Sequence, residues 1–325
     1  MKPAPFKYTL LAGLFMASSL GLMAQKKKPT STQQPASTTT APAKAQNEDD
    51  LMSMLENQVQ SEGKNSINYT TATFKTTRLI NGHSVENVGK GVLDFRLSHR
   101  FGTLNKGAYE MFGLDNASMR MGFDYGLTNR LMIGVGRSTY EKTIDAFFKI
   151  KLLAQSTGKR NMPITLSYVP TIAIKTLKWA NPDQKNYFSS RLFYSHQLII
   201  GRKFNEGTSL QLMPTLVHRN LVDSFYQSNN IFSIGIGGRQ KLSKRISINF
   251  EYYYVIPKYK LPNTTNCLSI GFDIETGGHV FQLHFTNSKG MHERAFISET
   301  NGKWEKGDIL FGFNLSRVFT IGKSR

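Results

Sequence analysis

Cysteine is nearly absent from this sequence of 325 residues, which contains only Cys267. A single cysteine cannot form an internal disulfide, and it cannot supply the cysteine pairs of a zinc ribbon or of a c-type haem motif. The chain must therefore be held together by burial and by pairing of its backbone. His292-Glu293 lacks the second histidine of a zinc-binding helix, so we expect no metal and no other cofactor.

Long apolar runs are also missing after the first few residues. No later segment has about 18 consecutive apolar residues or keeps a helical period over about four turns, which argues against membrane-spanning helices. Acidic residues are few, since Lys and Arg number 41 against 22 Asp and Glu, a net charge of +19. Such a charge can indicate nucleic-acid binding. Here the basic residues are scattered singly through alternating segments, and we predict no nucleic-acid partner.

The first residues have the pattern of a secretory signal peptide. Lys2 and Lys7 flank an apolar run that ends at Ala24, and we predict a signal peptide over residues 1–24 that is cleaved after Ala24. A membrane-anchor helix is the alternative, but the run is shorter than the roughly 20 residues that a helical span needs. No cysteine follows the run, which excludes a lipoprotein anchor. The chain is therefore expected to be exported.

Two further segments precede the main domain. Residues 25–46 consist mostly of Lys, Pro, Thr, Ser, Gln and Ala, a composition typical of a disordered linker. In residues 47–62, Asn47 and three acidic residues form a helix-start signal, and apolar residues then recur on one helical face. We predict a short amphipathic helix there. It either rests on the rim of the following domain or docks a periplasmic partner.

The rest of the chain alternates between apolar and polar residues, which is the period of a β-strand with two unlike faces. From Ala117 to Tyr125 the odd positions are apolar, and a five-residue connection then returns the chain through Leu131, Ile133 and Val135. Pairing Tyr125 with Leu131 would place the small and polar residues of both strands on one face. The pattern predicts a hairpin with one apolar and one polar side.

Twelve segments share this design and predict a transmembrane β-barrel over residues 91–325, with short turns at one end and longer connections, including Ser288–Gly307, outside the cell. Tyr69–Ile80 would be a thirteenth strand, so residues 63–90 are expected to be a barrel-associated segment that is inserted or packed on the rim. A barrel of fourteen strands and a soluble β-sandwich are the alternatives. The predicted strands are Val92–Phe101, Ala117–Tyr125, Leu131–Val135, Lys142–Leu152, Ile164–Lys175, Phe188–Lys203, Thr208–Arg219, Ile231–Leu242, Ile246–Ile256, Asn266–Thr276, His279–Asn287 and Asp308–Phe319.

The polar face is the candidate lumen of the barrel. Its bases outnumber its acids, and glycines on the same face permit tight curvature or leave room for long side chains. A ring of like charge biases a pore toward the opposite ion, so this face predicts a weak preference for anions. The lumen-facing candidates are Arg96, Arg100, Arg120, Asp124, Lys149, Arg191, Arg239, Glu251 and Asp273.

No arrangement of residues favours an enzyme. A membrane-embedded hydrolase would need a histidine and a serine on the lipid-facing side of the barrel. His196 and His218 have the parity of the apolar face, but Ser195 and Ser209 have that of the polar face. We therefore predict no catalytic residues.

Several runs carry a family resemblance. They include residues 73–86, 91–102 and 278–288, Glu293-Arg-Ala-Phe296 and Gly312-Phe-Asn-Leu-Ser-Arg-Val-Phe319. These runs resemble an uncharacterised family of outer-membrane β-barrel proteins of Gram-negative bacteria. The resemblance covers about residues 73–319 and implies a barrel fold and outer-membrane placement, with no established substrate. The aromatic residue that usually ends such chains is followed here by six more residues, 320–325.

The sequence thus predicts an outer-membrane barrel that passes small solutes, with outer-membrane lipid and small anionic solutes as partners. The alternative is a closed structural or scaffold barrel that docks periplasmic or surface partners, in part through residues 47–62. Whether the lumen is open decides between the two, and the strand pattern is the same for both.

Overall fold

The computed structural model describes residues 52–54, 66–222 and 227–321. The predicted signal peptide, the predicted linker and most of the predicted amphipathic helix lie outside these residues. Residues 52–54, which fall within the predicted helix, are helical.

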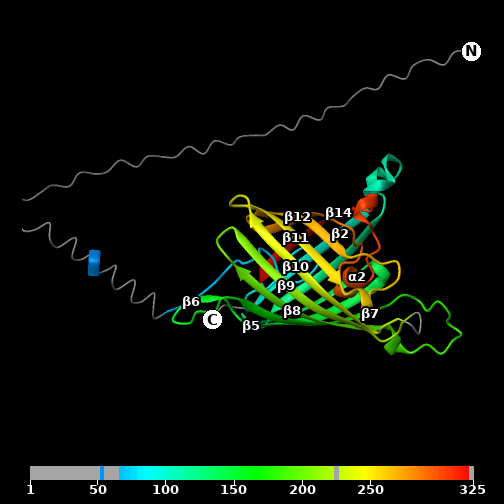
Figure 1. Cartoon of the computed structure of the whole chain (residues 1–325), viewed down its shortest axis with the longest axis horizontal. Helices are drawn as coiled ribbons and strands as arrows, with labels where there is room; N and C mark the ends of the chain where they lie inside the picture. The colour runs from blue at the N-terminus through cyan, green and yellow to red at the C-terminus, as the bar shows by residue number, and fades with distance from the viewer. Residues whose placement is uncertain (1–51, 55–65, 223–226, 322–325) are drawn as a thin grey trace, which may run out of the picture. The chain divides into compact units, whose positions relative to one another are not determined.

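Within the described residues, twelve strands form one closed antiparallel barrel (Figure 1). The last strand of the chain pairs with the first strand of the barrel, and this pairing closes the ring. The alternative with fourteen strands is therefore wrong. The barrel strands are β2 (Val92–Thr103), β3 (Ala117–Gly126), β4 (Leu131–Ser138), β5 (Thr143–Leu153), β7 (Thr165–Lys175), β8 (Leu192–Lys203), β9 (Thr208–Arg219), β10 (Asn230–Lys241), β11 (Ile246–Val255), β12 (Cys267–Thr276), β13 (His279–Thr286) and β14 (Leu310–Thr320).

Shorter elements complete the described chain. Two strands, β1 and β6, pair with each other outside the barrel. Besides the helical residues 52–54, the remaining elements are the α-helix α2 and several short 3-10 helices. Their bounds are β1 (Ile67–Tyr69), β6 (Ser156–Gly158), α2 (Glu293–Ser298), η1 (Leu104–Lys106), η2 (Ala108–Gly113), η3 (Tyr140–Lys142), η4 (Phe188–Arg191), η5 (Pro257–Tyr259) and η6 (Trp304–Lys306).

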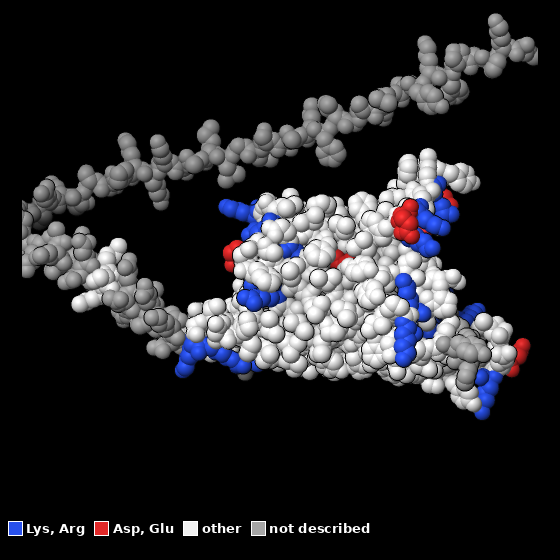
Figure 2. Space-filling model, in the orientation of Figure 1, with Lys and Arg blue, Asp and Glu red and all other residues white. Residues whose placement is uncertain are grey.

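The outer face of the barrel is apolar, as the alternation predicts. Side chains such as Phe123, Ile234 and Phe272 are 41–47% exposed although they are large and hydrophobic, while the polar residues between them point inward and are buried. Figure 2 shows a broad band of mostly uncharged side chains, with Lys, Arg, Asp and Glu gathered toward the two ends. No helix among the described residues is long and apolar enough to cross a membrane.

The two ends of the barrel differ in their connections. At one end the strands are joined by tight turns at residues 127–130, 204–207, 242–245 and 277–278, and we call this the short-turn end. The backbone N–H of Ile321 donates to the carbonyl of Gly91 at this end. The start of the first barrel strand and the end of the last one therefore lie together at the short-turn end. At the long-loop end the connections include residues 104–116, 176–191 and 287–309.

The register of the β3–β4 hairpin differs from the prediction by two residues. Tyr125 pairs with Ile133, not with Leu131. The predicted connection of five residues is too long because Leu127 donates its N–H to the carbonyl of Leu131, which extends the ladder into the turn. The hydroxyl of Thr128 also accepts the N–H groups of Arg130 and Leu131. A shift of two keeps every side chain on its predicted face.

Two segments fold into the barrel interior. We call residues 73–88 the plug, and all of its residues are buried except Lys75, Glu86 and Asn87, which are half-buried. We call residues 288–300, which contain α2, the inner loop, and every residue of α2 is buried. The expectation that Ser288–Gly307 lies wholly outside is therefore wrong for its first half. Of the two placements expected for residues 63–90, the plug has the inserted one.

Candidate functional site: the barrel interior

The plug is a small hairpin that presents its tip to the barrel wall. Arg78 and His83 form an antiparallel bridge, and the N–H of Leu79 donates to the carbonyl of Gly82 at 2.8 Å. The tip lies so close to β11 that a Cβ atom on Gly82 would fall 1.9 Å from the hydroxyl oxygen of Tyr253. Only glycine fits at this position without displacing the wall.

A carboxylate of the wall binds the backbone of the tip. Glu251, on β11 and fully buried, accepts N–H groups of Ile80, Asn81 and Gly82 at 3.0–3.3 Å. These donors would otherwise be unpaired inside the protein, which costs about 1–3 kcal/mol for each group. The carboxylate thus replaces the strand partner that a hairpin tip lacks.

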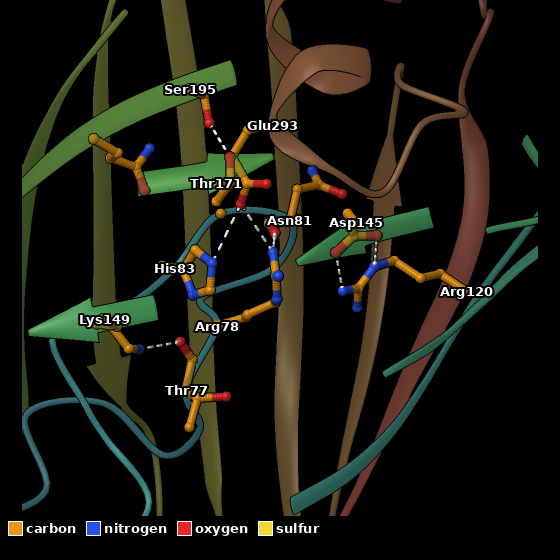
Figure 3. Close-up of polar contacts among 12 residues, drawn as sticks. Thr77, Arg78, Asn81, His83, Arg120, Asp145, Lys149, Thr171, Ser195 and Glu293 are labelled. Carbon is orange, nitrogen blue, oxygen red and sulfur yellow. Dashed lines mark hydrogen bonds and ion pairs between the residues drawn. The ribbon is translucent and has the colours of Figure 1, made fainter. Parts of the chain in front are cut away.

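An ammonium group of the wall binds the carbonyls of the same hairpin. Lys149, on β5 and fully buried, donates to the carbonyl oxygen of Thr77 at 3.0 Å (Figure 3). It also donates to the carbonyl oxygens of Ser84 at 3.1 Å and Glu86 at 2.5 Å. The three donors of the ammonium group are therefore matched by three backbone acceptors. Together with Glu251, this lysine recognises the plug through its main chain.

Amide and guanidinium side chains from other strands complete the hold on the plug. The side-chain amides of Gln282, Asn314 and Gln211 donate to backbone carbonyls of the plug at 2.7–3.0 Å. Arg100 donates to the side-chain carbonyl of Asn81 at 2.9 Å. Strands β2, β9, β13 and β14 thus add to the hold of β5 and β11, so the hairpin is held from many sides of the ring.

The plug and the inner loop meet in a buried ion-pair cluster. Glu293 of α2 lies 3.0 Å from Nη1 of Arg78 and 3.4 Å from Nε2 of His83 (Figure 3). All three side chains are at most 3% exposed. Beside them Arg120 of β3 binds Asp145 of β5 through two nitrogens, with Nε at 2.9 Å. These side chains form a polar partition across the barrel.

A glycine makes the second of these pairs possible. Arg120 reaches Asp145 by crossing β4 at Gly136, where an added Cβ atom would fall 2.2 Å from Nη2 of Arg120. The inward-facing glycine here leaves room for a long side chain. This was one of the two explanations that the sequence offered for the glycines of the polar face.

A cavity lies on each side of the partition. The cavity at the short-turn end has a volume of about 440 Å³ and is bounded by both the plug and the wall. The cavity at the long-loop end, which we call the vestibule, has a volume of about 500 Å³. The two have no lining residue in common. A smaller space of about 10 Å³, the size of one water molecule, is lined by Glu293 and by two residues that also line the vestibule, Phe193 and Arg294.

The floor of the vestibule is a second ion-pair cluster. Arg294 of α2 binds Glu141 at 2.6 Å and Glu299 at 2.5 Å, and it lies 3.8 Å over the ring of Phe193. Burial alone would raise the pKa of Glu141, but Arg294 and Lys175 hold it below its ordinary value. Burial raises the pKa of Glu299 above its ordinary value, although Arg294 opposes this. The pKa values of the two carboxyl groups are therefore shifted in opposite directions, although both groups bind Arg294.

Most predicted lumen residues contact the plug rather than an open channel. Arg96 and Asp124 both bind the hydroxyl of Thr77, and Arg239 lies 3.5 Å from the carbonyl of Ala72, just before the plug. Asp273 accepts a hydrogen bond from Gln282, which in turn binds the plug. Arg100, Lys149 and Glu251 bind the plug directly, and Arg120 lies in the partition.

Arg191 occupies a different place. It was expected within a strand on the lumen face, but it lies in η4, just before β8, at the rim of the vestibule. Its guanidinium carbon is 3.6 Å from the centre of the Trp179 ring. The strand begins later than predicted because Phe188–Arg191 forms a turn, closed by the N–H of Ser190 on the carbonyl of Tyr187.

Sequence reasoning missed the charged residues of the two inserted segments. Arg78, His83, Glu293 and Arg294 lie outside the barrel strands, where charged residues normally face water. Runs containing all four did carry the family resemblance, which was the one available signal. The two histidines with the parity of the apolar face have hydrogen-bond partners on neighbouring strands. His196 is bonded to the hydroxyl of Tyr168 and His218 to the side chain of Asn230, each at 2.7 Å.

The fold and its interior define a transmembrane β-barrel that is closed by an internal plug. The sequence from residue 74 to 319, well over half of the chain, matches the family model described as a membrane bound beta barrel domain (DUF5777). The chain belongs to this family. Among curated proteins the sequence has no significant match.

Solved barrels of similar fold include three porins and channels. The NanC porin is 8% identical with a TM-score of 0.45, and the match covers 70% of this chain and 98% of that one. The KdgM porin is 10% identical with a TM-score of 0.40, covering 70% and 99%. An outer membrane channel from Pseudomonas putida F1 is 13% identical with a TM-score of 0.43, covering 73% and 98%. Likenesses this distant carry no functional argument.

Proposed function

We propose that this protein is an outer-membrane channel for small solutes whose pathway is closed by the plug and the inner loop in the present conformation. The observation that carries the proposal is the pair of cavities at opposite ends of the barrel, separated by a hairpin that is not part of the wall. The hairpin is held by hydrogen bonds and ion pairs, which water can replace when the interior is hydrated. Its movement would join the two cavities.

Placement in the outer membrane is supported by two features. The first is the signal peptide predicted over residues 1–24, which directs export. The second is the β-barrel itself, because bacterial barrels of this kind have short periplasmic turns and longer outer loops. The short-turn end then faces the periplasm and the long-loop end faces the outside of the cell.

A weak preference for anions is part of the proposal. Among the described residues, eight bases and six acids are buried in the interior, an excess of two positive charges. Many of these charges are paired, which limits the field that a passing ion meets. The buried bases are Arg78, Arg96, Arg100, Arg120, Lys149, Arg219, Arg239 and Arg294, and the buried acids are Asp94, Asp124, Asp145, Glu251, Asp273 and Glu293.

A closed scaffold barrel is the second candidate, and the number of bonds that hold the plug favours it. In that case the interior network only braces the barrel. Its functional surfaces would then be the long loops and the segment 47–62, which we predicted to dock a periplasmic partner.

Conductance in planar bilayers separates the two candidates. Wild type, Lys149→Met, Glu251→Gln and the double variant are refolded and checked for heat-modifiable migration on gels. A channel predicts rare openings in wild type and a higher open probability in each variant, because each loses part of its hold on the plug. Its reversal potential in a salt gradient should also indicate anion preference. Arg202→Gln and Asp308→Asn are the matched controls, because Arg202 is exposed and lies over Phe204, and Asp308 binds the side chain of Asn105 and the N–H of Lys303. Folded variants that never conduct would contradict the channel and favour the closed scaffold barrel.

A further inference from the structure

The vestibule has the composition of a binding site. Its lining includes five bases and two acids, so it carries a formal excess of three positive charges. Its volume of about 500 Å³ lies within the range of about 300–1,000 Å³ typical of small-molecule pockets. The proposed outer end of the barrel therefore contains a basic cavity large enough for a small molecule with one ring.

Two arginines of the vestibule have donor groups without protein partners in the described structure. Arg294 is 5% exposed, and its Nε and Nη1 atoms are buried and make no hydrogen bond. Nε of Arg191 is also buried and makes no hydrogen bond, while Nη1 of Arg191 donates to the carbonyl of Lys175 at 3.2 Å. A buried guanidinium normally has its donors paired. Oxyanions match this need, since carboxylates and phosphates accept two parallel N–H bonds from one guanidinium.

Aromatic rings lie beside these donors. Arg191 is stacked on Trp179, and Arg294 is stacked on Phe193. Stacking holds each guanidinium plane in place, so little freedom is lost when a ligand binds. The same rings and Leu221 provide apolar surface within the cavity. The lining thus combines guanidinium groups held in place by stacking with flat apolar surfaces.

We propose that the vestibule binds a small oxyanion, a carboxylate or phosphate, carried on a ring. The charged group is held by Arg191 and Arg294, and the ring packs against Trp179 and Phe193. This inference deepens the proposed anion preference by naming a site and a ligand class, and its role in passage rests on the proposed function. Binding itself requires no open channel.

Tryptophan fluorescence can test the proposal, because Trp179 lines the site and the only other tryptophan, Trp304, lies elsewhere. In a Trp304→Phe background, refolded protein is titrated with benzoate, phenyl phosphate and the neutral benzyl alcohol. The expected result is saturable quenching or a spectral shift with at least one of the two anions and none with benzyl alcohol. Binding of only one anion would identify the oxyanion that the site takes.

Variants tie the signal to the site. Arg191→Gln and Arg294→Gln should each weaken anion binding by about tenfold or more, the effect expected from losing a charged hydrogen bond. Arg202→Gln, at the opposite end of β8, removes the same charge outside the vestibule and should leave binding unchanged. Heat-modifiable migration shows which variants are folded, and a folded member of the pair is sufficient for the test.

The outcomes against the proposal are equally definite. It is overturned if wild type binds neither anion, if benzyl alcohol binds as tightly, or if every variant of the pair that folds binds like wild type. Failure of the channel proposal would look different, because a protein that binds the anions and never conducts retains the site. Conduction without anion binding would overturn the site and leave the channel proposal intact.

Discussion

Lys149 binds carbonyl groups and Glu251 binds N–H groups of the same hairpin backbone. The lysine binds three carbonyl oxygens of the plug, and the glutamate binds N–H groups of three successive residues at its tip. These hydrogen bonds are made to the main chain of the plug, and the tip needs glycine at position 82 to come this close to β11. The barrel wall therefore holds the hairpin by its main-chain geometry, and the two residues come from strands β5 and β11 on different parts of the ring.

Weakening this hold should expose the tip of the plug. In Glu251→Gln the charged acceptor becomes a neutral amide, which lowers the strength of each hydrogen bond to the N–H groups of residues 80–82. A loss of about 1.4 kcal/mol would raise the rate of amide hydrogen exchange about tenfold at these positions. Exchange measured by mass spectrometry on peptides covering residues 76–88 checks this. Asp308→Asn removes a carboxylate at the rim and should leave those peptides unchanged; equal exchange in both variants would contradict the assigned role of Glu251.

Filling the space at Gly136 should break the Arg120–Asp145 pair. In Gly136→Ala the new Cβ atom overlaps the guanidinium of Arg120, and we expect a loss of about 1–3 kcal/mol in the free energy of unfolding, as for overpacked interiors. Urea unfolding in micelles, followed by heat-modifiable migration, gives the value. Gly278→Ala is the matched control, since an added Cβ meets no atom within 4 Å there. A Gly136 variant as stable as the control would show that Arg120 has another route to Asp145.

The orientation of the barrel can be tested with single cysteines. The background variant is Cys267→Ser, which removes the buried native thiol. A cysteine in place of Lys303, exposed at the long-loop end, should react with an impermeant reagent on intact cells. A cysteine in place of Lys244, exposed in a turn at the short-turn end, should react only after lysis. The reverse pattern would invert the barrel in the membrane.

Anion binding in the vestibule should strengthen as the pH falls. Glu299 faces Arg294, Glu141, Lys175 and Tyr140, and burial raises its pKa, so it takes up a proton first as acid is added. Burial and the neighbouring carboxylates raise the pKa of Tyr140 to about 12, so it stays neutral. Losing one negative charge at about 6 Å in water should tighten benzoate binding about threefold.

The measurement is a benzoate titration at about pH 7.5 and about pH 5, a range in which an unperturbed carboxyl group stays largely ionised. Glu299→Gln should bind benzoate with the same affinity at both pH values, and at least as tightly as wild type does at the lower one. A pH dependence that persists in Glu299→Gln would assign the proton to another group. Glu141 is the next candidate, although its lowered pKa places its titration at more acidic pH.

The sequence by itself determined the wall of this protein. Alternation is a local property, because successive side chains of a strand point to opposite faces whatever lies next to them. It therefore predicted the twelve strands, the apolar outer face and the inward direction of residues such as Arg120 and Glu251. Even the wrong register at Tyr125 kept the faces, since an error of two residues preserves the alternation.

Only the tertiary structure decided what fills the barrel. Arg78 pairs with Glu293, 215 positions away in the chain, and Lys75 with Glu275, 200 positions away. Such pairs leave no period in the sequence, and a charged residue in a loop has the same local pattern whether it faces water or a buried partner. The plug and the inner loop enter the barrel because its inward-facing charges and amides need partners that the strands alone do not supply.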